Sequence, residues 1–120
     1  MRLAWLTDIH LNFLGERQLD DFLASVAAHR PDAVLIGGDI GEAPSLPGYL
    51  RRIADRLERP IYFVLGNHDF YHGSFRAVHA AVEELTVESR WLTWLTRAGV
   101  IELTPEVGLV GHDSWADGRC

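Results

Sequence analysis

The sequence predicts an α/β protein built on a parallel sheet, and three observations lead to that prediction. Apolar runs rich in β-forming residues occupy positions 2–7, 32–37 and 61–65, about thirty residues apart. Each interval between them carries the spacing of an amphipathic helix. The run at 32–37 is apolar on both faces, as a central parallel strand requires. Strands that alternate with helices in this way form parallel sheets through right-handed crossovers.

Helical periodicity defines three helices in chain order. The first runs from Glu16 to His29, and Pro31 stops it. The second runs from about Pro47 to Glu58. The third follows Ser74, whose hydroxyl suits a helix N-cap.

Short strands are predicted in the last part of the chain. They cover Leu92–Thr96 and Val100–Leu103, around a turn at 98–99, and then Val107–Val110. We interpret these strands as the beginning of a second sheet. The predicted order is therefore βαβαβα followed by ββ and β.

Composition limits the class of protein. The chain has 120 residues, of which 48% are hydrophobic and 23% charged, so we expect one globular domain over residues 1–120. A net charge of −6 argues against a passive electrostatic grip on nucleic acid, although bound cations could still attract phosphate. The single cysteine, Cys120, excludes an internal disulfide, and no apolar run is long enough for a signal-peptide core or a membrane span. We therefore predict a cytoplasmic protein that does not enter membranes.

Polar side chains follow each of the three main strands at its carboxyl end. They are Asp8 and His10 after the first strand, Asp39 after the second, and Asn67, His68 and Asp69 after the third. Because the carboxyl ends of neighbouring parallel strands meet at one edge, we expect these residues to converge. A mixed set of carboxylates and imidazoles suits Mn, Fe, Zn or Ni better than calcium. Each motif alone could instead form a simple turn.

Three motifs, in this order, resemble the first three motifs of the calcineurin-like metallophosphoesterases: Asp8-x-His10, Gly38-Asp39 and Gly66-Asn67-His68-Asp69. The resemblance implies the N-terminal part of a four-layer α/β/β/α sandwich. It also implies hydrolysis of a phosphomonoester or phosphodiester at a site with two divalent transition metal ions.

The same resemblance implies a role for each matching residue. Asp8, His10, Asp39 and Asn67 would ligate metal, with Asp39 bridging the two ions. His68 would assist the leaving group, and Asp69 would hold the His68 imidazole and favour its charged form. His72 lies near enough along the chain to contact the substrate.

The sequence departs from the family pattern after Asp69. The family has two later motifs, a lone histidine after a strand and Gly-His-x-His, and Gly111-His112-Asp113-Ser114 matches only half of the second. We interpret His112 as the end of a structural strand, with a ligand role as the alternative. The metal shells are then incomplete, and the chain is expected to be an N-terminal part of the domain, truncated at its C-terminus.

An incomplete sandwich has consequences for surface and function. We expect part of the inner face of the first sheet to be open to water, near Trp91, Trp94 or Trp115, so that the chain self-associates. The alternative function is a non-catalytic metal- or phosphate-binding domain. A nucleotide-binding module is disfavoured because no strand is followed by a glycine-rich phosphate loop.

Overall fold

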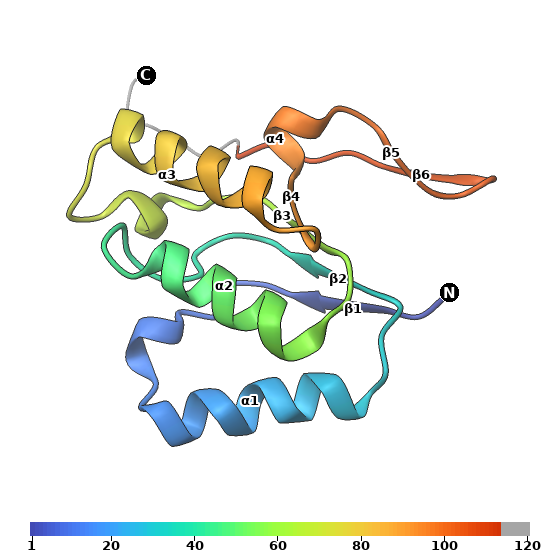
Figure 1. The fold of residues 1–120 in the computed structure, drawn as a ribbon, viewed down its shortest axis with the longest axis horizontal. Coiled ribbons are helices and arrows are strands. Elements are labelled where there is room, and N and C mark those ends of the chain that lie inside the picture. Colours follow the sequence, from blue (N-terminus) through green and yellow to red (C-terminus); the bar gives the residue numbers. More distant parts are fainter. Residues whose placement is uncertain (114–120) are drawn as a thin grey trace.

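A four-stranded parallel sheet forms the centre of the molecule in the computed structural model, which describes residues 1–113 (Figure 1). The strands are β1 (Leu3–Leu6), β2 (Ala33–Ile36), β3 (Ile61–Phe63) and β4 (Leu92–Trp94), and they lie in the order β1-β2-β3-β4. The connecting helices are α1 (Glu16–Ala28), α2 (Leu46–Leu57) and α3 (Phe75–Glu88). The predicted α/β class and its parallel sheet are confirmed.

The three long helices cover one face of this sheet. Every crossover joins neighbouring parallel strands, and right-handed crossovers of this kind place their helices on the same side. The helices pack in sequence order, α1 against α2 and α2 against α3 (Figure 1). One register row across the four strands consists of Leu6, Ile36, Phe63 and Trp94. Their side chains point into the core on the helix-covered face of the sheet. The carboxyl ends of the strands in this sheet carry the candidate functional site.

The helix boundaries follow local sequence signals. The hydroxyl of Ser74 accepts a hydrogen bond from the backbone N–H of Ala77 at 3.1 Å, which confirms the predicted N-cap of α3. Pro47 lies in the first turn of α2, where its missing N–H costs nothing. After Leu57 the chain turns through Glu58 in the left-handed region, with φ of 48°.

The prediction that a second sheet begins at residue 92 is wrong. Strand β4 pairs in parallel with β3 and completes the first sheet. The next residues form a short helix, α4 (Leu95–Ala98), and only β5 (Ile101–Thr104) and β6 (Val107–Leu109) form a separate antiparallel hairpin. A short apolar run carries no information about which strand it will pair with, so periodicity could not assign the sheet.

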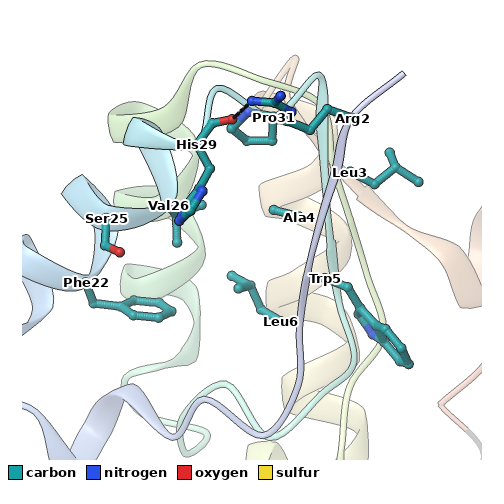
Figure 2. A pocket seen from close by; sticks show the side chains of 10 residues that line it. All are labelled: Arg2, Leu3, Ala4, Trp5, Leu6, Phe22, Ser25, Val26, His29 and Pro31. Atoms are coloured by element: carbon teal, nitrogen blue, oxygen red, sulfur yellow. Dashed lines mark hydrogen bonds between the residues drawn. The ribbon is translucent and has the colours of Figure 1, made fainter.

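The sheet face opposite the helices is uncovered at β1, as far as residues 1–113 show. Figure 2 shows Ala4 and Leu6 pointing toward α1, while Leu3 and Trp5 point to the other side. Trp5 is 74% exposed. The expectation that Trp94 lies near this open face is wrong, because Trp94 is buried against α3. The other two are Trp91, which is partly buried against the core, and Trp115, which lies outside the described residues.

An apolar cavity lies between the free edge of β1 and helix α1 (Figure 2). Its volume is about 390 Å³, and the guanidinium of Arg2 closes one end by donating to the carbonyl of His29 at 2.8 Å. None of the residues predicted to form the functional site lines it. Within residues 1–113, no helix has both the length and the apolar character needed to cross a membrane.

Candidate functional site

The carboxyl ends of β1 and β2 bring three candidate metal ligands together. Asp8 and His10 follow β1, and Asp39 follows β2. One ligand atom from each, a carboxylate oxygen or an imidazole nitrogen, lies within 4.8 Å of the other two. Asp8 is exposed, His10 is half-buried and Asp39 is buried. The cluster is therefore open to a ligand on one side and supported by the protein on the other.

Backbone hydrogen bonds hold the two ligand-bearing loops side by side beyond the strands. The N–H of Asp8 donates to the carbonyl of Gly38 at 3.2 Å, and the N–H of His10 donates to the carbonyl of Asp39 at 2.9 Å. The N–H of Leu11 continues the row to the carbonyl of Ile40 at 2.8 Å. The main chain thus fixes the relative positions of the two loops that carry the three candidate ligands.

All three candidate ligands have left-handed backbone conformations. The φ angles are 49° at Asp8, 43° at His10 and 49° at Asp39. An L-residue other than glycine pays about 1–2 kcal/mol in this region, less for aspartate. Such strain accumulates at functional sites, where the surrounding structure over-determines it. The backbone of these loops therefore adopts an unfavourable conformation at the three residues whose side chains converge.

Two glycines allow the loops after β2 and β3 to approach closely. A Cβ atom at Gly66 would collide with the carboxylate of Asp39. Gly38 has φ of +100°, and a Cβ there would lie 2.8 Å from the backbone nitrogen of Gly66. The carboxylate of Asp39 fills the released space, where its Oδ1 accepts from the N–H of His68 at 3.0 Å. Its Oδ2 lies 3.8 Å from Nε2 of His10.

The carboxylate of Asp69 joins the same two loops, the one after β2 and the one after β3. Its Oδ1 accepts from the N–H groups of Ile40 and Gly41, each at 2.9 Å, and its Oδ2 accepts from the N–H of Gly66 at 2.9 Å. Burial of the side chain, and to a smaller extent the nearby charge of Asp39, raise the pKa of Asp69 to about 6, against the opposing effect of these three donors. At neutral pH the carboxylate is mainly ionised.

The expected orientation of the His68 imidazole by Asp69 is not what the structure shows. Both carboxylate oxygens of Asp69 are directed at backbone N–H groups. The two residues belong to a 3₁₀ helix, η2 (Asn67–Phe70), in which successive side chains point in different directions. Sequence adjacency therefore did not produce contact between them.

His68 is held by aromatic neighbours instead. Its ring lies edge-on to the ring of His10, with 5.0 Å between centroids, and tilted against the ring of Tyr71 at 4.3 Å. His68, predicted from the sequence to assist the leaving group, therefore lies beside the cluster of candidate metal ligands. Tyr71 was missed in the sequence, where its place in an aromatic loop after Asp69 was the available signal.

His72 lies apart from this group. It is exposed, and its Nε2 is 3.5 Å from Oε2 of Glu42. It does not line the cavity beside Asp39. Its role in contacting substrate stays a prediction.

A cavity of about 210 Å³ lies next to Asp39. Its lining residues come from four segments of the chain and are Asp8, Gly37, Asp39, Val64, Leu65, Gly66, Asn67, His112 and Asp113. Asn67 is exposed. His112, interpreted from the sequence as the end of a structural strand, lies on the wall of this cavity after β6 has ended.

The donor set fits a transition metal ion. Two carboxylates and one imidazole match the mixed oxygen and nitrogen preference of Mn, Fe, Zn and Ni. For a second ion, the lining of the cavity offers Asp39 again and the amide oxygen of Asn67. Within residues 1–113, no other group of three acidic, histidine or cysteine side chains converges in this way.

A parallel sheet with candidate metal ligands at its carboxyl edge can support metal-dependent hydrolysis. The chain belongs to the calcineurin-like phosphoesterases, whose family model matches residues 1–117. A probable cyclic nucleotide phosphodiesterase of Pseudoalteromonas sp. (strain SM9913) is 32% identical in a match of 82 aligned positions, and the match covers 58% of this chain. The match spans 31% of the length of that relative. The predicted family is confirmed.

Proposed function

We propose that this protein hydrolyses phosphate esters at a site containing two divalent metal ions. The convergence of Asp8, His10 and Asp39 beside the His68 ring is the observation that carries the proposal. The first ion would be held by these three side chains. The second would be held by Asp39 and Asn67, which line the same cavity.

The bound ions would supply Lewis acidity and an activated water for displacement at phosphorus. The protein residues supply orientation and proton transfer. One carboxylate oxygen of Asp39 accepts from the backbone N–H of His68, and the other is directed toward His10. The two oxygens thus face different neighbours, and the one carboxylate could contribute to both proposed metal positions. His68, restrained by two neighbouring rings, would donate a proton from its imidazole to the leaving-group oxygen.

The substrate is proposed as a phosphate monoester or diester. The name of the curated relative makes a cyclic nucleotide the first diester to test. Nothing in the charge of the chain favours a nucleic acid duplex. The cytoplasmic location predicted from the sequence stays a prediction.

Metal loading followed by an ester assay tests this proposal. The chain is loaded separately with Mn²⁺, Zn²⁺, Fe²⁺ and Ni²⁺, and bound metal is measured by elemental analysis. At low metal concentration we expect about one ion per chain, held weakly by Asp8, His10 and Asp39, and a second ion only at higher concentration, because Asp39 and Asn67 offer it fewer ligands. Both ions should be lost in Asp39→Ala and neither in the exposed control Asp21→Ala. Hydrolysis is then measured with bis(p-nitrophenyl) phosphate, p-nitrophenyl phosphate and cyclic nucleotides.

The outcomes separate the two functions left open by the sequence. Metal-dependent hydrolysis that disappears in Asp39→Ala supports the enzyme. Metal uptake without hydrolysis of any ester supports the alternative, a non-catalytic metal-binding domain. Wild-type protein that takes up no transition metal refutes the proposal.

A further inference from the structure

His112 and Asp113 form one wall of the cavity beside Asp39, and hydrogen bonds hold this segment in place. Oδ1 of Asp113 accepts hydrogen bonds from the N–H of Leu65 at 2.7 Å and from the indole Nε1–H of Trp94 at 3.1 Å. The N–H of Asp113 donates to Oγ1 of Thr96 at 3.0 Å. The segment is therefore tied to the loop after β3 and to the end of β4, and the same β3 loop leads into the Gly-Asn-His-Asp motif.

Gly111 sets the closeness of this approach. A Cβ atom at this position would lie 2.7 Å from Cδ1 of Leu95 and 3.1 Å from Cγ1 of Val64. A larger residue there would require the side chains of Leu95 and Val64, or the segment itself, to move. The chain is thus held against the sheet on both sides of His112, by packing before it and by hydrogen bonds after it.

The chemistry of the cavity needs a hydrogen-bond donor. Asp8 and Asp39 contribute carboxylates, and a phosphate ester adds further oxygen acceptors and negative charge. Among the described residues that line the cavity, side-chain N–H groups belong only to Asn67 and His112. Asn67 is proposed to turn its carbonyl oxygen to a metal ion. An imidazole retains at least one N–H in every protonation state.

We propose that His112 is a further substrate-binding residue of this site and donates a hydrogen bond to an oxygen of the phosphate group. Asp113 is its positioning residue, because its carboxylate fixes the segment to Leu65 and Trp94. The inference rests on the proposed function, since it requires metal and phosphate at the same cavity. It assigns no metal-ligand role to His112, which lies outside the convergent ligand group.

Phosphate binding by the metal-loaded 120-residue chain tests the role of His112. Inorganic phosphate is titrated by calorimetry into Mn²⁺-loaded wild type, His112→Ala and His112→Gln, with bound metal measured on the same samples. We expect His112→Ala to weaken phosphate binding by about 10- to 100-fold, the range for one hydrogen bond to a charged group. Metal content should not change, and His112→Gln, which keeps an N–H donor, should recover most of the affinity. His29→Ala, an exposed histidine at the end of α1, is the matched control and should bind like wild type.

A double-mutant cycle tests the positioning role of Asp113. Asp113→Ala should weaken phosphate binding, while Asp113→Asn, which keeps an acceptor oxygen for the N–H of Leu65, should restore it. If Asp113 acts through His112, adding Asp113→Ala to His112→Ala should cause no further loss. A purely structural role would instead give additive losses.

Each negative result contradicts a different part of the proposal. Wild type that takes up no metal defeats the proposed function, and this inference falls with it. Wild type that binds metal and phosphate while His112→Ala binds phosphate equally well overturns only the role of His112. Loss of metal in His112→Ala also overturns that role, because it would make His112 a ligand. Additive losses in the cycle overturn the role of Asp113.

Discussion

Removing the carboxylate of Asp69 should destabilise the protein before it affects any chemistry. In Asp69→Ala the N–H groups of Ile40, Gly41 and Gly66 lose their acceptor. Ile40 and Gly41 are buried, so water cannot replace the lost oxygen without entering the core. The loops that carry the candidate metal ligand Asp39 and the His68 motif would then lose their common attachment.

The size of the effect follows from two opposing terms. Each buried donor left without a partner costs about 1–3 kcal/mol, and the partly exposed N–H of Gly66 costs less because water reaches it. Burial already opposes the ionised carboxylate, as the pKa of about 6 shows, and the variant no longer bears that desolvation cost. We therefore expect Asp69→Ala to lower the free energy of unfolding by about 2–4 kcal/mol. Asp69→Asn should lose about 1–2 kcal/mol, because Oδ1 is kept and only the acceptor facing Gly66 is replaced.

Urea-induced unfolding of the metal-free chain, followed by tryptophan fluorescence, measures these differences. EDTA removes any contribution from bound metal. Asp21→Ala, an exposed acidic residue on α1, is the control and should stay within about 0.5 kcal/mol of wild type. An Asp69→Ala variant as stable as Asp21→Ala would refute the structural role. An Asp69→Ala variant that kept its stability but lost turnover would instead support the role predicted from the sequence, in which Asp69 orients the imidazole of His68.

Three other predictions address the chemistry, the backbone and the exposed face. His68→Ala should lower kcat by about 10²–10⁴-fold with metal content unchanged, and loss of metal in elemental analysis would contradict its role as an acid. Asp8→Gly should be more stable by about 1 kcal/mol than Asp8→Ala in urea unfolding, since only glycine relieves the positive φ, whereas Ala80→Gly in α3 should destabilise by a similar amount. Trp5→Gln should reduce hydrophobic dye binding and self-association in sedimentation, and unchanged behaviour would exclude this face as their cause.

Local pattern was sufficient for much of the fold. Apolar runs and helical spacing predicted the first three strands and three helices, because a buried strand and an amphipathic helix each require a fixed periodicity. Ser74 was identified as an N-cap since its hydroxyl acts within one turn of the chain. The convergence of Asp8, His10 and Asp39 was also predictable, because parallel neighbours place their carboxyl ends at one edge.

Long-range pairing was decided only in the tertiary structure. Strand β4 could have started a new sheet, and its place beside β3 depends on α3 packing across the sheet and on contacts between residues far apart in sequence. The same limit explains why Trp5, in a predicted strand, is exposed: the exposure depends on which face the helices cover.

What the sequence by itself determined was the set of side chains at the strand ends and the chemistry that such a set permits. Side-chain direction in the irregular loops was decided by the tertiary structure. Asp69 points to backbone donors of two loops rather than to its neighbour His68. His112 lines the cavity, and the next residue, Asp113, is bound to Leu65, 48 positions away. Periodicity fixes direction only within regular elements, whereas in loops the partners that satisfy buried polar groups fix it, and those partners come from elsewhere in the chain.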